Sequence, residues 1–154
     1  MNESYNKELH NGYLDDKGVI RLCFVDGLPQ KLADSFNRAE PTLSTKQART
    51  IYDSVNGLYG QLTRKNITFD EAKVELVMLK SRINDKKNKG AISEEFYDFF
   101  VDNVDVVKTH KDFMAFTLHF EAICNYLKDG KPSTSDSYKN KGDNKYQNKN
   151  NFRR

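Results

Sequence analysis

The sequence is poor in the residues that build disulfides, metal sites and redox centres. Among its 154 residues are two cysteines, three histidines, three prolines and no tryptophan. Cys23 and Cys124 lie far apart without CxxC spacing, and no metal-type spacing relates His10, His110 and His119. We therefore expect no disulfide framework and no metal centre, and we predict a reduced cytoplasmic protein.

Long apolar runs and catalytic motifs are also missing. No run approaches the roughly 20 apolar residues that cross a bilayer, and the opening MNESYNKELH has no apolar signal-peptide core. The eight glycines form neither GxGxxG nor GxxxxGK[ST], and no GxSxG nucleophile motif occurs. The sequence therefore predicts no membrane span, no cofactor and no enzymatic activity.

Charge is distributed unevenly along the chain. Residues 131–154 contain seven Lys/Arg and two Asp, whereas residues 1–130 contain 18 Lys/Arg and 20 Asp/Glu. Because the larger part is nearly neutral, any case for nucleic-acid binding there depends on where its cations lie. Residues 131–154, here called the basic tail, are rich in Asn and Lys, have almost nothing to bury, and are predicted to be disordered in isolation.

Apolar residues recur at spacings of three and four from residue 29 onward, which is typical of amphipathic helices. The predicted helices cover roughly residues 29–40, 44–62, 68–85, 93–107 and 109–128. Ser44 with Gln47 and Thr68 with Glu71 match capping boxes, and Ser93 is a predicted N-cap. The last helix is apolar on most sides, which favours a position at the centre of a bundle.

The first 28 residues lack such a pattern. Residues 1–18 are polar with turn signals, and Val19–Val25 is apolar enough for a short strand, an extended arm or a distorted helical turn. No second strand-like run follows, so a sheet is not expected. The predicted fold is all-α: residues 1–130 form a compact bundle of about five helices with an irregular N-terminal arm (1–28), followed by the disordered basic tail.

The helix predicted at 44–62 carries an unusual outer side. A helical wheel places Lys46, Arg49 and Arg64 away from its apolar face, together with Gly57 and Gly60. Cations near a helix N-terminus oppose the dipole, and glycines in a helix cost about 1 kcal/mol each. A polyanion that approaches the backbone would explain both features. An ordinary solvated face with a local break at GLYG is the alternative.

The next helix carries a second set of cations. Lys73, Lys80 and Lys87 recur every seven residues along one edge of its apolar stripe. Near its end lie Arg82, Lys86 and Lys89. Because cations at a helix C-terminus are favoured by the dipole, this pattern fits either a helix-end charge cluster or a ridge that contacts phosphates.

Four short motifs follow one another between residues 12 and 128. They are NGYLDDKGVIR, LSTKQAR at the opening of a long helix, LKSRI late in the next helix, and DFMAFTLHFEAICNYLK. Their order resembles the small subunit of type III-A CRISPR effector complexes, the Csm complexes. The strongest parts are the Thr/Ser-x-Gln-x-Arg helix start at Thr45, Gln47 and Arg49, and FEAICNYLK, which is similar to the family's FEAxxAYxK ending.

This resemblance implies a non-catalytic helical bundle with a role in antiviral defence. Family members stack in several copies beside the duplex of guide CRISPR RNA and target RNA, and they touch its backbone without reading sequence. By position, Lys46 and Arg49 match the family's basic helix start, and Lys80 and Arg82 match a basic segment in the next helix. This chain departs from the family after LKSRI, where KKNKG replaces an aromatic-containing run with an Arg, and in its basic tail.

The resemblance and the cation pattern together lead to a set of predicted RNA-binding residues: Lys46, Arg49, Arg64, Lys73, Lys80, Arg82, Lys86 and Lys87. RNA phosphates would supply the negative charge that the helix start at Lys46 and Arg49 lacks. The expected partners are guide and target RNA, further copies of the chain, and the backbone and large subunits of the complex.

A competing hypothesis assigns the protein a function without nucleic acid. The chain would be a cytoplasmic helical adaptor that binds a protein through an aromatic surface, with Phe99, Phe100 and Tyr97 as candidate anchors. The same residues also fit an ordinary core. The adaptor hypothesis predicts RNA binding no stronger than the basic tail provides.

Overall fold

The computed structural model describes residues 3–129, and all regular elements within this range are helical. The bounds of these elements are α1 Glu3–His10, η1 Leu22–Phe24 (a 3-10 helix), α2 Leu28–Arg38, α3 Thr45–Thr63, α4 Phe69–Asn88, α5 Glu94–Val106 and α6 His110–Tyr126. The all-α prediction is confirmed. The prediction for the basic tail concerns residues that lie outside the described range.

The helices from α3 onward begin where the sequence predicts, because their N-cap side chains make the expected hydrogen bonds. The Thr68–Glu71 capping box is complete, with N···O distances of 3.1 and 3.0 Å. At Ser44 only half of the predicted box forms. Ser44 Oγ accepts from the backbone N–H of Gln47 at 3.1 Å, but the Gln47 side chain donates instead to the carbonyl of Ala91 at 3.2 Å.

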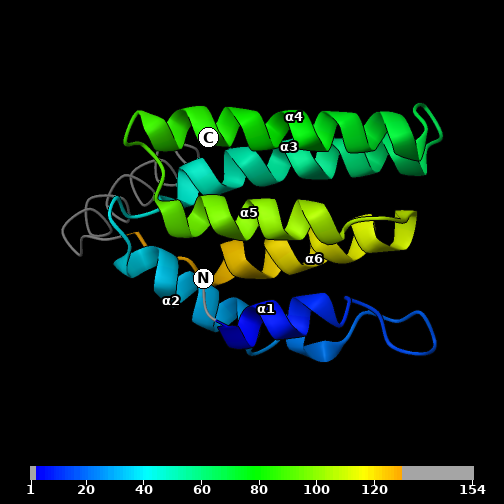
Figure 1. Ribbon diagram of the computed structural model, residues 1–154, viewed down its shortest axis with the longest axis horizontal. Coiled ribbons are helices and arrows are strands. Elements are labelled where there is room, and N and C mark those ends of the chain that lie inside the picture. The colour runs from blue at the N-terminus through cyan, green and yellow to red at the C-terminus, as the bar shows by residue number, and fades with distance from the viewer. Residues whose placement is uncertain (1–2, 130–154) are drawn as a thin grey trace, which may run out of the picture.

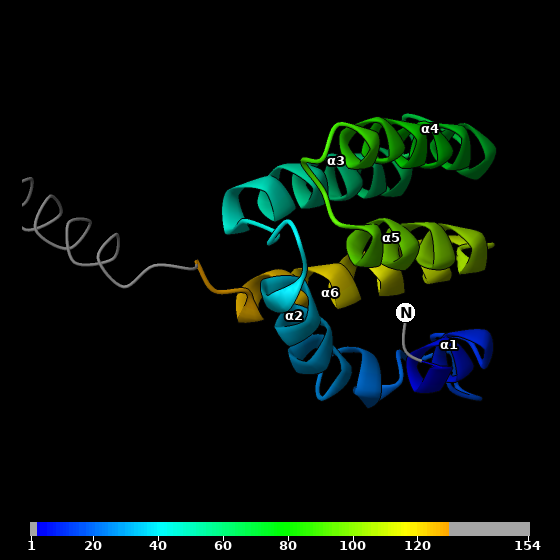
Figure 2. The ribbon, with the colours of Figure 1, turned by 60° about the vertical axis from the view of Figure 1, so that its left-hand side comes forward.

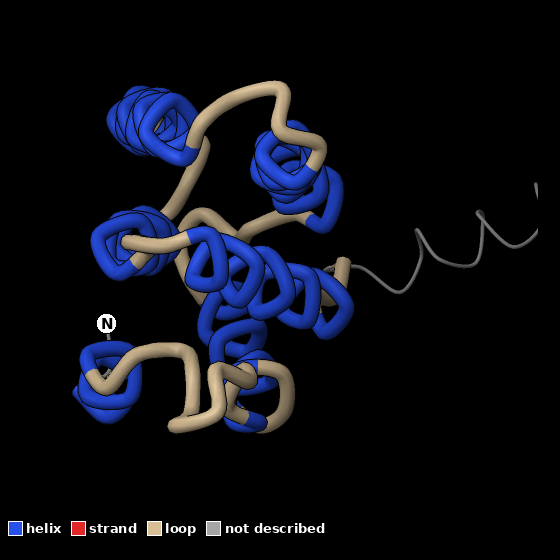
Figure 3. Tube along the Cα trace, turned by 90° about the vertical axis from the view of Figure 1, so that its right-hand side faces the viewer, coloured by secondary structure: helices blue, strands red, loops and turns tan. Residues whose placement is uncertain are grey.

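The helices are arranged in three layers (Figure 1). The antiparallel pair α3 and α4 forms one outer layer, α5 and α6 form the middle layer, and α1, η1 and α2 form the other outer layer, as the views in Figures 2 and 3 also show. In the contacts between layers, α3 and α2 pack on α6, while α4 and α1 pack on α5. No helix within residues 3–129 is long and apolar enough to cross a membrane.

Helix α6 holds the centre of the bundle, as predicted. Its Phe113, Phe116 and Phe120 are fully buried. Phe120 packs against Phe99 and Phe96 of α5, with ring centroids 5.8 and 6.0 Å apart. Aromatic rings at these separations contribute both buried area and favourable ring contacts, so a phenylalanine cluster joins the two helices of the middle layer.

The N-terminal segment is more regular than the sequence predicts. Residues 3–10 form helix α1, although this stretch was expected to be irregular, and its Tyr5 and Leu9 are buried. Only these two residues, one helical turn apart, form an apolar face, so periodicity gives little signal. The following segment has a single β-bridge between Leu14 and Ile20 and then the turn η1, which combines the extended and helical alternatives.

A buried polar network fastens this segment to the middle layer. Tyr5 Oη lies 2.9 Å from His119 Nε2 and accepts from Asn103 Nδ2 at 2.8 Å, while Tyr13 Oη donates to Asn103 Oδ1 at 2.6 Å. His119 Nδ1 lies 2.5 Å from the carbonyl of Phe24. Because a carbonyl only accepts, Nδ1 carries the hydrogen and the neutral ring accepts from Tyr5 at Nε2.

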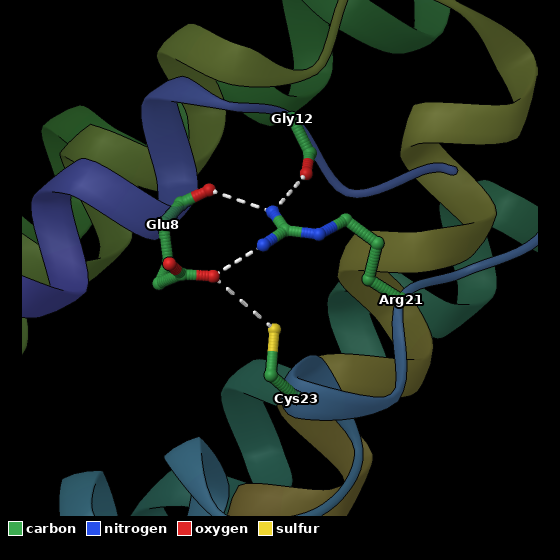
Figure 4. Close-up of polar contacts among 4 residues, drawn as sticks. All are labelled: Glu8, Gly12, Arg21 and Cys23. Atoms are coloured by element: carbon green, nitrogen blue, oxygen red, sulfur yellow. Dashed lines mark hydrogen bonds and ion pairs between the residues drawn. The ribbon is translucent and has the colours of Figure 1, made fainter. Parts of the chain in front are cut away.

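A second polar cluster closes the loop between α1 and η1 (Figure 4). The Arg21 guanidinium donates to the carbonyl oxygens of Glu8 and Gly12 at 3.1 and 2.9 Å, and it forms an ion pair with the Glu8 carboxylate. Cys23 Sγ donates to the same carboxylate at 3.6 Å. Residues without an apolar pattern are thus held by charge-assisted hydrogen bonds from one guanidinium to two backbone carbonyls and one carboxylate.

Candidate nucleic-acid interface

A basic groove runs along the seam between α3 and α4. It has a volume of about 460 Å³ and contains three of the predicted RNA-binding residues, Lys46, Arg82 and Lys86. The remaining lining residues are Thr42, Ser44, Gln47, Thr50, Ile51, Ser54, Leu79 and Ile83. This set combines cations and hydroxyl groups over an aliphatic floor and includes no carboxylate. These are the side chains that bind phosphate oxygens in protein–nucleic acid interfaces.

The antiparallel hairpin brings the groove's cations together. Lys46 lies in the first turn of α3, whereas Arg82 and Lys86 lie late in α4, which runs back alongside α3. Helix α4 continues past residue 85, where the predicted helix ended, as far as Asn88, so Lys86 is helical. The hydrogen bond from Gln47 to Ala91 ties the start of α3 to the segment after α4. Residues far apart in the sequence therefore share one surface.

Arg49 does not share this groove with Lys46. Its Nη2 donates to Asn125 Oδ1 at 2.6 Å, and its guanidinium lies 5.8 Å from the Tyr52 ring centroid. Tyr52 Oη in turn donates to Glu121 at 3.0 Å. The two cations that the sequence pairs at one helix start thus have different surroundings: Lys46 lies in the α4 seam, and Arg49 lies against α6.

The N-terminus of α3 already has an anion. The carboxylate of Asp129 accepts from Thr45 Oγ1 at 2.7 Å and from the Thr45 backbone N–H at 3.3 Å. A carboxylate at this position stabilises the helix dipole. The chain therefore supplies negative charge of its own at this helix start, and Asp129 was not recognised in the sequence as its source.

Lys73, Lys80 and Lys87, here called the lysine ridge, follow one another along α4. Two of them, Lys73 and Lys87, contact α5. Lys73 Nζ donates to the carbonyl of Val107 at 2.6 Å and also to that of Val104, which satisfies the C-terminus of α5. Burial lowers the pKa of Lys73. Lys87 Nζ lies 4.3 Å from the Tyr97 ring centroid, a cation–π contact. Lys80, half-buried, lies between them in the sequence.

Arg64 lies at the opposite end of α3 from Lys46, about 27 Å away by helical rise. Its guanidinium folds back onto Gly60, where a Cβ would lie 3.2 Å from Nη1. Because Nη1 is the end of a flexible and exposed side chain, it can move aside, so this contact does not require glycine at position 60. At Gly57 a Cβ would meet no atom of the described chain within 4 Å.

The near-neutral charge of the chain conceals a separation between layers. Residues 45–92, which contain α3 and α4, have ten Lys/Arg and five Asp/Glu, whereas the other described residues have eight Lys/Arg and 15 Asp/Glu. The outer layer that contains the groove therefore has a formal charge of +5, and the other two layers together have −7. Sequence reasoning missed this separation because it treated residues 1–130 as one body. It also missed the uncharged polar lining of the groove, although Gln47, Thr50 and Ser54 recur at helical spacing.

The candidate anchors of the adaptor hypothesis are not available on the surface. Phe99 and Phe100 are fully buried in the aromatic core, and Tyr97 is half-buried beneath Lys87. The observed side chains therefore offer no aromatic docking surface on α5.

The described residues thus form a helical bundle whose groove between α3 and α4 has the cationic and polar chemistry of a phosphate-binding surface. The family model Csm2 Type III-A matches residues 26–133. The chain therefore belongs to this family, the small subunits of type III-A CRISPR effector complexes. The match covers α2 to α6 and the whole groove. No curated protein and no solved structure matches the chain.

Proposed function

We propose that the protein is a non-catalytic subunit that lies along the duplex of guide CRISPR RNA and target RNA and contacts its phosphate backbone without sequence readout. In this role it serves antiviral defence in the cytoplasm. Its protein partners are further copies of itself and the backbone and large subunits of the complex. Base pairing between guide and target supplies the sequence specificity, so backbone contacts are sufficient for this subunit.

One observation carries the proposal: Lys46, Arg82 and Lys86 line a single groove. None of these three cations forms an ion pair within the described residues. Their positive charge is therefore available to an external anion. The acidic charge of the other layers repels a polyanion, which orients the α3/α4 layer toward RNA.

The RNA partners are tested by isolating a tagged copy from its native cells, with and without RNase treatment. We expect CRISPR-associated subunits together with a discrete, protected guide RNA. A set of protein partners without RNA or CRISPR proteins would refute the proposal and favour an adaptor.

The groove is tested with Lys46→Ala, Arg82→Ala and Lys86→Ala combined, measured in the assembled complex. Each lost phosphate contact is expected to reduce the slope of log affinity against log salt by about one. The matched control replaces three exposed lysines outside the α3/α4 layer, Lys7, Lys31 and Lys108, with Ala. Equal losses in the two triple variants would show that the groove is not the RNA contact.

A further inference from the structure

The seam between α3 and α4 continues beyond the basic groove into a pocket of different chemistry. This second pocket, here called the acidic pocket, has a volume of about 400 Å³ and is lined by Leu58, Gln61, Ile67, Glu71, Val74 and Glu75. On α3, Leu58 follows Ser54 of the basic groove by one helical turn. On α4, Glu75 precedes Leu79 of the basic groove by one turn. The two pockets are therefore consecutive along one seam.

The acidic pocket combines an apolar floor with two carboxylates and has no cationic lining residue. Val74 is 61% exposed and its neighbour Met78 is 46% exposed, which leaves an apolar strip on the surface of α4. Glu71 accepts from the Thr68 backbone N–H at 3.0 Å, and this bond lowers its pKa and keeps it charged. Such a site repels a polyanion and favours an apolar or aromatic side chain that has positive charge beside it.

The basic tail contains this chemistry three times. Its only aromatic residues are Tyr138, Tyr146 and Phe152, and each has a Lys or Arg next to it in the sequence. The pairs are Tyr138–Lys139, Lys145–Tyr146 and Phe152–Arg153. The tail lies almost wholly beyond the family match, which ends at residue 133.

The tail also starts close enough to reach the acidic pocket. Asp129, the last described residue, is hydrogen-bonded to Thr45 at the start of α3. Leu58 lies 13 residues further along α3, about 20 Å by helical rise. The nine residues from 130 to 138 span up to about 30 Å when extended. Tyr138 and both later aromatic residues are therefore within reach in the same chain.

We propose that residues 138–154 dock on the acidic pocket of their own chain, with an aromatic ring on Leu58, Ile67 and Val74 and the neighbouring Lys or Arg beside Glu71 and Glu75. The short tether gives the tail an effective concentration in the millimolar range, so a weak contact is sufficient. The occupant needs no fold of its own, because one ring and its flanking cations make the contact.

Docking would change the charge along the seam. The six Lys/Arg of residues 138–154 would neutralise the two carboxylates and extend the positive surface of the basic groove along α3. This consequence rests on the proposed function, whereas the docking itself does not.

The test uses full-length protein without RNA and follows the methyl NMR signals of Leu58, Ile67 and Val74. Replacing Tyr138, Tyr146 and Phe152 together with Ser removes the rings, and the methyl signals of these three pocket residues are expected to move while those of the buried Ile123 stay in place. Raising the salt concentration should produce the same shifts in the unmodified chain, because salt screens the rim charges. Unchanged pocket signals would overturn the docking.

A matched pair of variants tests the pocket from the other side. Val74→Ser lies in the pocket, and Val77→Ser lies on the same helix outside its lining. Only Val74→Ser is expected to release the tail, seen as a change in the ring signals of Tyr138, Tyr146 and Phe152. Shifts that vanish on dilution, or that occur only when RNA is added, would overturn docking within one chain and assign the tail to a second copy or to RNA. RNA affinity, measured separately, then tests the proposed function.

Discussion

The two outer layers of the bundle use polar side chains in opposite ways. In the α1 layer, Tyr5 and Tyr13 bond to the buried Asn103 and His119, so that polar groups are satisfied inside the protein. In the α3/α4 layer, Lys46 and Arg82 are exposed on a groove. The first arrangement stabilises the fold, since an unmatched buried group costs about 1–3 kcal/mol. The second leaves hydrogen-bonding capacity for a partner.

The largest expected effect concerns His119 and pH. Burial lowers its pKa from 6.5 to about 4, so the unfolded chain binds a proton at this side chain at higher pH than the folded chain. Its contribution to stability is complete above about pH 6.5 and is lost as the pH falls toward 4, with a total of about 3 kcal/mol. Urea unfolding of the unmodified chain and His119→Gln should therefore give stabilities that converge as the pH falls.

The control for this experiment is His110→Gln, which removes an exposed histidine. A convergence of equal size in the two variants would not be specific to the buried ring. If the stability of His119→Gln stayed parallel to that of the unmodified chain, the network would not depend on the neutral ring.

A smaller effect separates two lysines of the α4 ridge. Lys73→Ala removes the donor to the Val104 and Val107 carbonyls, and we expect a loss of about 1–2 kcal/mol in the free energy of unfolding. Lys80→Ala, for which no such bond is observed in the described structure, should stay within about 0.5 kcal/mol. Thermal melting of both variants checks the difference, and equal losses would mean that the cap at α5 is not a stabilising contact.

The smallest expected effect is on Gly57, which lies in the α3/α4 layer. Because a Cβ there meets no atom of the described chain, Gly57→Ala should stabilise the protein by about 0.5–1 kcal/mol through helix propensity. If RNA approaches the α3 backbone, the same variant should bind RNA more weakly. Thermal melting measures the stability of this variant, and titration with RNA measures its affinity. Unchanged RNA affinity would mean that RNA does not approach the backbone at Gly57.

The sequence by itself determined the helices from α2 to α6 and the family. The i, i+3 and i+4 spacing of apolar residues and N-caps such as Thr68 and Ser93 act over a single turn, so local chemistry is sufficient to place helix starts. The short motifs that led to the type III-A family are likewise contiguous in the chain. Membership in that family is confirmed over residues 26–133.

The tertiary structure decided which polar residues act together. Helix α1 forms because Tyr5 and Leu9 bury against the middle layer, a contact that no local pattern reveals. Lys46 and Arg49 are only three residues apart, yet they face different helices. Lys46 and Lys86 share a groove because the antiparallel arrangement of α3 and α4 places the start of α3 beside the end of α4. Packing between distant segments also separates the charge between layers and brings Lys73 to the carbonyls at the end of α5. Composition and periodicity do not reveal such packing.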